Sequence, residues 1–546
     1  MITKQKNYKL RLVTVLLLFF FLFLIISVRL YLTQIHRKNF FRNLASQQYA
    51  AEITSFPPRA IIYDRYNNPL TINTEAISTF ILPQQFENPK KTKKILKQHF
   101  KHVYKRLKKQ PNKKFLWLNR KLSEKEASDI KKYNCPDIHF IEEPKRFYPY
   151  QSLATLIGFT NIDNKGIEGI ELQCNKLLNG SPTKYQIEKD ARNNSFYFKK
   201  HIIKQGKEGT PVTLTIDNTL QFLAYEELKE TIEKYEANSG SVVIMNPETG
   251  EILAMASYPD IDPNKKITNI NDIEKSKNIS ITECHEPGSI IKTFATLAAF
   301  EENVVTFDEE IDCGGKVAYI DGFRVKNPSW KPIDTIPFWQ AIQKSSNIGV
   351  AKVVKRLGTK FYDHLKKLGF GETTGIQFPG ERNGFVNPPH KWSKPSLIVL
   401  SFGYEINGTI LQLAKAFSII ANGGYNIQPT LFKNDIGHKK NAPLYKQESI
   451  ELTKDVLETI GIKYGVDGYR VMGKTGTARC IKDGKYTNKE HVYSFGGIVE
   501  KDDYKRVIIT FINRPKNPYL WAAQLTAPFF KRIAEKMVIH DITNNT

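Results

Sequence analysis

The chain has 546 residues, 41% of them hydrophobic and 12% aromatic, which predicts two or more folded units and excludes an intrinsically disordered protein. A formal net charge of +25 would fit a nucleic-acid partner. However, the sequence contains neither zinc-finger spacing nor a glycine and aromatic RNA-binding pattern. We therefore expect no nucleic acid as a partner, and at most a general attraction to anionic lipid or wall polymer.

The cysteines are odd in number, far apart, and without the paired spacing that a zinc site requires. They are Cys135, Cys174, Cys284, Cys313 and Cys480. We therefore predict no metal site. A disulfide between Cys284 and Cys313 in an oxidising compartment stays open, and buried free thiols are the simpler interpretation.

The N-terminal segment contains an uncharged apolar run from Leu12 to Val28, just long enough to cross a bilayer as a helix. Four basic residues precede it, which places the tail in the cytoplasm by the positive-inside rule. A cleaved secretory signal is the alternative, but no small-residue cleavage site follows. We expect a cytoplasmic tail over 1–11, a retained anchor over 12–32 in the bacterial inner membrane, and an extracytoplasmic (periplasmic) remainder.

A non-catalytic domain is expected over 33–205. Residues 59–65 predict a strand that runs into a turn at Asn67-Asn68-Pro69. The lysine-rich stretch from Pro89 to Lys114 has helical spacing, which is typical of a solvated helix rather than a binding patch.

A second domain is expected over 206–546. Its predicted strands are 212–217, 241–245, 251–257, 469–472, 493–499 and 506–513. Residues 219–236 and 527–538 predict amphipathic helices, and 290–460 is mostly helical. Because strand patterns occupy both ends of this domain, we predict one sheet built from both ends with a helical insertion, an α/β (α+β) fold.

The first of three ordered motifs is Ser289-Ile290-Ile291-Lys292, which follows a turn and begins an apolar helix. A serine there lies near free backbone N–H groups, and Lys292 lies one turn along on the same face. Burial should lower the pKa of Lys292, so that its neutral amine can take the Ser289 proton. Ser-x-x-Lys also occurs at 128–131 and 181–184, so a capping serine beside a snorkelling lysine is the alternative for the motif alone.

The second motif is Ser345-Ser346-Asn347. The Ser345 hydroxyl can pass a proton to a leaving amine, and the Asn347 amide can hold a substrate peptide bond from both sides. An ordinary helix cap is the alternative interpretation.

The third motif is Lys474-Thr475-Gly476-Thr477, which occurs once. On a strand beside the serine, Lys474 supplies charge, Thr475 and Thr477 supply donors for a carboxylate, and Gly476 permits close backbone approach. The backbone N–H groups of Ser289 and Thr477 are predicted to form an oxyanion hole. A turn with a surface lysine is the alternative.

This ordered triplet is typical of the serine enzymes that react with penicillin. Together with its flanking segments, it resembles the class B penicillin-binding proteins along nearly the whole extracytoplasmic chain. The flanking segments include 59–65, 146–149, 158–159, 166–171, 247–255, 378–381, 401–404, 411–414 and 422–424. The resemblance implies a serine-transpeptidase fold with a central antiparallel sheet and an inserted helical subdomain, preceded by a transmembrane helix and an elongated β-rich pedestal.

The resemblance also implies a peptidoglycan D,D-transpeptidase. Ser289 would attack the penultimate D-alanine carbonyl of a stem peptide and release D-Ala, and β-lactams would acylate the same hydroxyl. Lys292 would be the base, Ser345 would relay the proton, and Lys474 would tune that relay. The implied substrate-binding residues are Asn347, Thr475, Gly476 and Thr477. No metal or organic cofactor is needed.

The implied partners are stem peptides on a lipid-linked precursor or nascent glycan, β-lactam antibiotics, the membrane, a glycosyltransferase and divisome proteins. The Ser-Ser-Asn triplet and the Phe-Pro-Gly-Glu segment at 378–381 are more similar to the septal (cell-division) branch than to the elongation branch. An elongation-type (cell-shape) transpeptidase is the closest alternative. A D,D-carboxypeptidase, a serine β-lactamase and a β-lactam-binding signalling receptor are further ones. Glu405, where glycine is commoner in the family, leaves the shape of its loop in question.

Overall fold

The computed structural model describes residues 2–41, 50–55, 57–113, 115–188, 200–265, 267, 269–328, 331–435 and 442–545. The last residue of the predicted lysine-rich helix, Lys114, lies outside them. The chain forms two compact units. The first comprises Met1–Pro58 and Asn179–Gly209, and the second comprises Arg59–Leu178 and Thr210–Thr546.

The first unit contains the N-terminal helix and a small sheet. Helix α1 (Ile2–Tyr31) continues into a π-helical turn, η1 (Leu32–His36). The stretch Tyr8–His36 is long and apolar enough to cross a membrane, is exposed, and includes the predicted span 12–32; the described residues contain no second such helix. Strands β1 (Ala50–Ser55), β6 (Thr183–Glu188) and β7 (Lys200–Lys204) form an antiparallel sheet in the order β1-β6-β7.

The second unit begins with a three-stranded sheet covered by helices on one face. Its elements are β2 (Ile62–Tyr63), β3 (Ile72–Ile81), α3 (Pro89–His99), α4 (Lys101–Lys109), β4 (Leu116–Leu122), α5 (Glu124–Lys131) and β5 (His139–Phe147). The strand order is β4-β3-β5. The predicted lysine-rich helix is two helices, because it breaks at Phe100, whose ring packs into the core of this region. Its lysines are exposed, as predicted for a solvated surface.

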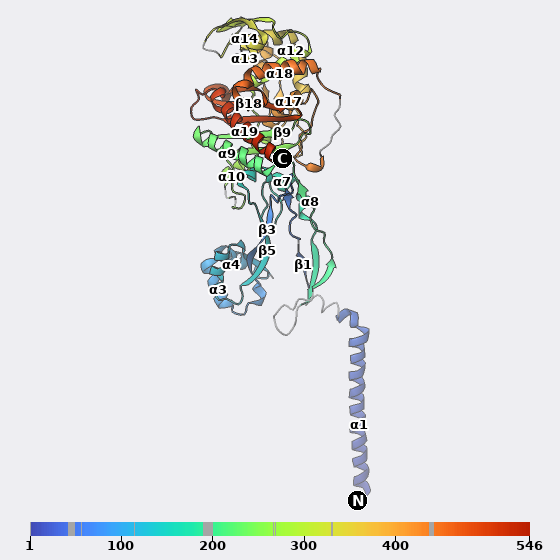
Figure 1. Cartoon of the computed structure of the whole chain (residues 1–546). Coiled ribbons are helices and arrows are strands. Elements are labelled where there is room, and N and C mark those ends of the chain that lie inside the picture. The colour runs from blue at the N-terminus through green and yellow to red at the C-terminus, as the bar shows by residue number, and fades with distance from the viewer. Residues whose placement is uncertain are drawn as a thin grey trace. The chain divides into compact units, whose positions relative to one another are not determined.

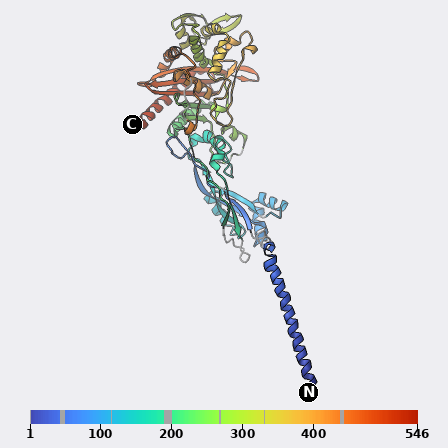
Figure 2. The same ribbon diagram turned by 90° about the vertical axis from the view of Figure 1, so that its right-hand side faces the viewer.

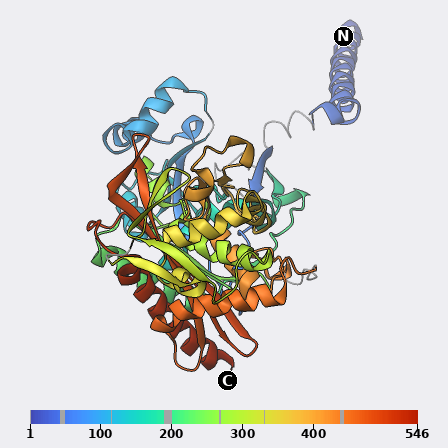
Figure 3. The ribbon, with the colours of Figure 1, turned by 90° about the horizontal axis from the view of Figure 1, so that it is seen from above.

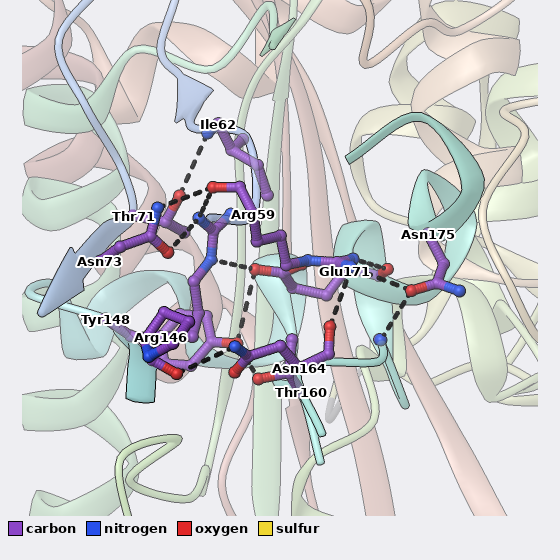
Figure 4. Close-up of polar contacts among 12 residues, drawn as sticks. Arg59, Ile62, Thr71, Asn73, Arg146, Tyr148, Thr160, Asn164, Glu171 and Asn175 are labelled. Atoms are coloured by element: carbon purple, nitrogen blue, oxygen red, sulfur yellow. Dashed lines mark hydrogen bonds and ion pairs between the residues drawn. The ribbon is translucent and has the colours of Figure 1, made fainter. Parts of the chain in front are cut away.

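A buried group of charges ties together segments far apart in the chain (Figure 4). Glu171, in α7 (Gly169–Gln173), binds the guanidinium groups of both Arg59 and Arg146, and all three side chains are at most 1% exposed. Arg59 also donates to Asn175 Oδ1 at 2.9 Å. The predicted strand over 59–65 is only two residues long, β2, which pairs in parallel with β8 (Val212–Thr213).

Replacing Glu171 with glutamine is expected to destabilise the second unit by about 3–5 kcal/mol, because two buried guanidinium groups would lose the carboxylate that pairs with them both among the described residues. The measurement is the thermal midpoint of the full chain in detergent. The matched control is Asp129→Asn, which makes the same chemical change in an exposed pair with Lys132 and should cost less than about 1 kcal/mol. Equal midpoints for the two variants would contradict the stabilising role of this group.

The central sheet of the second unit is antiparallel and has the order β10-β9-β19-β18-β17. Its strands are β9 (Ser239–Met245), β10 (Ile252–Tyr258), β17 (Arg470–Lys482), β18 (Lys485–Lys501) and β19 (Tyr504–Asn513). As predicted, strands from both ends of the domain meet, since β9 lies beside β19. Alternate side chains enter different cores: Val242 and Ile244 pack on one face, Val243 and Met245 on the other.

Helices cover both faces of this sheet (Figure 1 and Figure 2). Helices α9 (Asn218–Lys234) and α19 (Ala522–Asn545) pack on one face, and α17 (Ile410–Ala421) packs on the other. Helix α18 (Gln447–Gly461) then packs against α12 (Ile291–Glu301) and α13 (Phe338–Gln343), a layer seen from above in Figure 3. The serine motif therefore begins a helix buried at the centre of the unit.

The insertion between β10 and β17 contains more strand than the sequence predicts. Its remaining helices are α10 (Ile270–Lys275), α11 (Ile279–Thr282), α14 (Asn347–Leu357), α15 (Lys360–Lys367) and α16 (Ser396–Leu400). Its strands, β11 (Glu310–Gly315), β12 (Val317–Ile320), β13 (Phe323–Lys326), β14 (Ile333–Pro337), β15 (Phe385–Val386) and β16 (Ile406–Asn407), form three two-stranded sheets. Strands β11, β12 and β13 pack against α14, whose start carries the second motif.

Candidate active site

Ser289 lies in a 3₁₀ turn, η4 (Gly288–Ile290), which leads directly into α12. The turn packs so closely on its neighbours that glycine is required. A Cβ atom at Gly288, which has φ +57°, would lie 2.4 Å from the carbonyl oxygen of Thr477, and one at Gly403 would lie 2.1 Å from that of Gly288. The Ser289 hydroxyl is half-buried and makes no hydrogen bond within the described part of the chain.

Lys292 is completely buried, and its amine lies among groups of the second motif. Its Nζ atom is 2.7 Å from the Ser345 carbonyl oxygen, 2.7 Å from Asn347 Oδ1 and 3.1 Å from Ser345 Oγ. Burial and the neighbouring charge of Lys474 lower the pKa of Lys292 well below its usual value. A neutral amine fits this environment, because two N–H groups can donate to the two obligate acceptors while its lone pair accepts from Ser345 Oγ.

The second motif is held at the start of α14. Ser345 has φ +57°, and Ser346 caps the helix by accepting from Gly349 N at 3.0 Å. The Asn347 side chain donates to the Lys326 carbonyl oxygen at 2.8 Å and accepts from Lys292. One N–H of its amide is left for a ligand.

Sequence reasoning missed Asn327, a buried residue that holds the second motif in place. Its Oδ1 atom accepts from Ser346 Oγ, Asn347 N and Ile348 N at 3.0, 2.9 and 3.2 Å. Its Nδ2 atom donates to the carbonyl oxygens of Cys313 and Gly315. A lone asparagine after a strand gives no sequence signal for this role, because its partners are a second strand and a helix start.

Lys474 lies on β17, the edge strand of the central sheet, and is 1% exposed. Its Nζ atom donates to Ser345 Oγ at 3.2 Å and to the Thr475 carbonyl oxygen at 3.2 Å, and burial lowers its pKa to about 7. The two lysines therefore meet at one hydroxyl. Since Lys474 and Lys292 each approach Ser345 Oγ, the protonation of one governs that of the other.

The remaining residues of the third motif bring β17 against the serine turn. A Cβ atom at Gly476 would lie 2.7 Å from the Pro287 carbonyl oxygen, so no larger residue fits. The Thr477 carbonyl oxygen lies against Gly288. Because the N–H and C=O of one strand residue point to the same side, the Thr477 N–H also faces η4. This is the orientation that the predicted oxyanion hole needs.

These groups surround one cavity of about 670 Å³. Of the predicted site residues, Ser289, Ser345, Asn347, Thr475 and Thr477 line it, while Lys292, Lys474 and Gly476 lie behind its wall. Sequence reasoning missed the other lining residues. They are Pro328, Lys331, Lys344, Phe402, Tyr404, Arg479, His491, Trp521, Ala522 and Ala523.

Two family matches cover most of the chain. Residues 240–535 match the penicillin binding protein transpeptidase domain, and residues 54–214 match the penicillin-binding protein dimerisation domain. The chain belongs to the class B penicillin-binding proteins.

Relatives in this family resemble the chain over most of its length. A probable peptidoglycan D,D-transpeptidase PbpC of Pseudomonas aeruginosa is 31% identical, over 98% of this chain and 95% of the relative. Stage V sporulation protein D of Bacillus subtilis is 31% identical, over 96% of this chain and 84% of the relative. Peptidoglycan D,D-transpeptidase FtsI of Escherichia coli is 30% identical, over 87% of this chain and 82% of the relative.

Solved structures share the fold of this family at lower identity. Penicillin binding protein 3 of Mycobacterium tuberculosis, in complex with aztreonam, has a TM-score of 0.66 at 24% identity and covers 90% of this chain and 97% of its own. A peptidoglycan synthetase of Bifidobacterium adolescentis has a TM-score of 0.69 at 20% identity, with coverages of 90% and 96%. The predicted serine-transpeptidase fold is confirmed.

The loop in question at Glu405 has a defined structure. Glu405 has φ +57°, the conformation in which glycine is usual. Its carboxylate accepts from Asn387 Nδ2 at 2.5 Å, and its backbone N–H donates to Glu286 Oε1 at 3.3 Å. These two contacts hold the loop that carries Tyr404 into the cavity. All five cysteines are free thiols.

Proposed function

We propose that this penicillin-binding protein is a peptidoglycan D,D-transpeptidase that crosslinks stem peptides through an acyl-enzyme on Ser289 and is acylated by β-lactams at the same atom. The observation that carries the proposal is the meeting of two buried lysines at Ser345 Oγ, beside the cavity that also contains the Ser289 hydroxyl. The family membership and the relatives that are named D,D-transpeptidases support it.

The first step transfers an acyl group to the enzyme. Ser289 Oγ forms a bond to the carbonyl carbon of the penultimate D-alanine, and its proton passes to Lys292. The C–N bond to the terminal D-alanine breaks, and Ser345 relays the proton to the leaving amine, with Lys474 adjusting the acidity of that hydroxyl. Backbone N–H groups of Ser289 and Thr477 stabilise the negative oxygen between these events.

The second step makes the crosslink. An amine on a neighbouring stem attacks the ester carbonyl, its proton returns through the same groups, and the Ser289 hydroxyl is regenerated. The outcome depends on excluding water in favour of the amine, and a cavity lined by Phe402, Tyr404 and Trp521 suits that requirement.

The edge of the central sheet supplies the peptide-binding surface. Among the strands that the structure describes, β17 pairs with β18 alone, so its other edge can accept an extended peptide as a further strand. Thr475 and Thr477 then donate to the terminal carboxylate, Gly476 allows the close approach, and the remaining amide hydrogen of Asn347 binds the peptide.

The septal branch is the role we propose, since relatives named FtsI match most of the chain. The exposed apolar helix makes the protein a single-pass membrane protein, and we propose that 1–11 is cytoplasmic, 12–32 spans the inner membrane, 33–205 is a non-catalytic docking domain and 206–546 is the extracytoplasmic transpeptidase domain. A glycosyltransferase and divisome proteins are the proposed partners.

The full chain in detergent, supplied with nascent glycan that carries pentapeptide stems, should form crosslinked stem dimers and release D-Ala, and penicillin should stop both. D-Ala without dimers would identify a carboxypeptidase, and steady hydrolysis of penicillin would identify a β-lactamase. Localisation of the protein along the side wall rather than at midcell would favour the elongation role.

A further inference from the structure

The cavity has a charge that the terminal carboxylate of a stem peptide does not balance. None of its fifteen lining residues is acidic, whereas Lys344 and Arg479 are cationic. The proposed function already assigns the terminal carboxylate to Thr475 and Thr477. The surplus of positive charge therefore indicates a substrate with a further negative group.

Arg479 is the cation best placed to bind that group. It lies two residues after Thr477 on β17, so both side chains point to the same face of the strand. Its guanidinium lies over the rings of Tyr404 and Tyr486, at 5.7 and 5.3 Å from their centres. The two rings stand nearly perpendicular to each other, at 81°, and their cation–π contacts hold the guanidinium in place, while its N–H groups can make a planar, two-pronged contact with a carboxylate.

No carboxylate of the described residues forms an ion pair with Arg479, whose single side-chain hydrogen bond is a long one of 3.5 Å to Asn488 Oδ1. Glu286, an acidic residue nearby, is held by other groups. It accepts from Tyr486 O–H at 2.9 Å and from Glu405 N at 3.3 Å, and burial raises its pKa. Arg479 is therefore available to a ligand.

His491 provides a second, independent indication of a ligand. It pairs directly with Arg479 across β17 and β18 and also lines the cavity. Its Nδ1 atom is buried and has no hydrogen-bond partner among the residues whose positions the structure gives. Burial and the charge of Arg479 lower the pKa of His491, so its ring is neutral near pH 7 and can donate to a bound oxygen through this atom. A buried polar atom without a partner is costly, and a ligand oxygen would satisfy it.

The direction of the bound peptide brings its upstream residues to this position. A peptide that adds antiparallel to the edge of β17, with its carboxyl end at Thr475 and Thr477, places its preceding residues farther along the strand toward Arg479. Two residues of strand span roughly 7 Å, about the separation of alternate residues in the peptide.

We propose that Arg479 and His491 form a second carboxylate subsite, which selects stem peptides that carry a free carboxylate upstream of the reacting D-alanine over stems in which that group is an amide. The inference rests on the proposed function, because it needs a stem peptide bound along β17.

The test uses two pentapeptides that end in D-alanyl-D-alanine and differ at the third residue, which carries either a free side-chain carboxylate or its primary amide. Each peptide competes with a fluorescent penicillin for the full chain, and the peptide concentration that halves the labelling rate is measured. The wild type should favour the free acid at least tenfold. Arg479→Gln should weaken the free acid by roughly 10–100-fold and the amide by less than about twofold, since a charged hydrogen-bonded contact contributes about 1.5–3 kcal/mol.

The matched control is Lys485→Gln, which removes one charge from the exposed turn of the same hairpin, outside the cavity, and should leave both peptides unchanged. Equal weakening of both peptides in Arg479→Gln, no discrimination by the wild type, or loss of penicillin labelling in that variant would each overturn the subsite. Failure of the wild type to react with penicillin would instead contradict the proposed function.

Discussion

Replacing Ser289 with alanine is expected to abolish covalent labelling of this penicillin-binding protein by a fluorescent penicillin. The label is an ester of the Ser289 oxygen, and alanine has no oxygen to acylate. The fold should survive, because the hydroxyl is half-buried and makes no hydrogen bond to any described residue, so its removal leaves no partner unsatisfied. The measurement is fluorescence of the full chain on a denaturing gel, beside its thermal midpoint.

The chain supplies its own controls for this variant. The sequence Ser-x-x-Lys also occurs at 128–131 and at 181–184. Ser128→Ala and Ser181→Ala therefore remove the serine of the same motif at two other positions in the chain. Ser128 is on the exposed surface of α5, and Ser181 lies outside the transpeptidase match. Both variants should label like the wild type. A label that persists in Ser289→Ala, or disappears from either control, would contradict the assignment of the nucleophile.

Much of the fold follows from local patterns in the sequence. The alternation in β9 and β19 predicts strands because their side chains enter two different cores, as those of Val243 and Ile244 do. The three motifs are expected to lie close together in the fold, because acyl transfer needs the side chains of all three in one site. The structure brings them together through Gly288 and Gly476, whose missing side chains allow η4 to lie against β17.

Long-range partners could not be predicted from local patterns. The pairing of Arg59 with Glu171 joins residues 112 positions apart, and neither has a sequence environment that indicates burial. The strands of the insertion are too short to show an alternation of apolar and polar residues. The sequence therefore predicts β12 and β13 as part of a helical region. Asn327 follows β13 and was missed for the same reason.

The partner of Lys292 is the most instructive difference within the site. One helical turn separates it from Ser289, so spacing alone indicates a direct contact. In the structure its amine is directed to Ser345 and Asn347 instead. These residues supply two obligate acceptors to a side chain that is fully buried from solvent. A completely buried amine must satisfy its N–H groups, and this requirement outweighs proximity along the helix.

Replacing Lys292 with methionine is expected to slow acylation of Ser289 by penicillin by roughly 10²–10⁴-fold, the usual contribution of a positioned general base. Methionine keeps the length and volume of the side chain without a buried amine. The measurement is the rate of labelling, compared among variants whose thermal midpoints equal that of the wild type. Lys355→Met, on the outer face of α14, makes the same change in an exposed lysine and should leave the rate unchanged.

The pH dependence separates a base from a residue that only fills space. In the wild type, labelling should accelerate as pH rises through the pKa of Lys292, because only its neutral amine can take the serine proton. Burial and the charge of Lys474 lower that pKa, so the rise comes at lower pH than for an ordinary lysine. In Lys292→Met this dependence should disappear along with the rate. If the slow variant kept the same rise with pH, the proton would have to pass from Ser289 to another group, and Lys474, whose pKa is lowered to about 7, would be the alternative base.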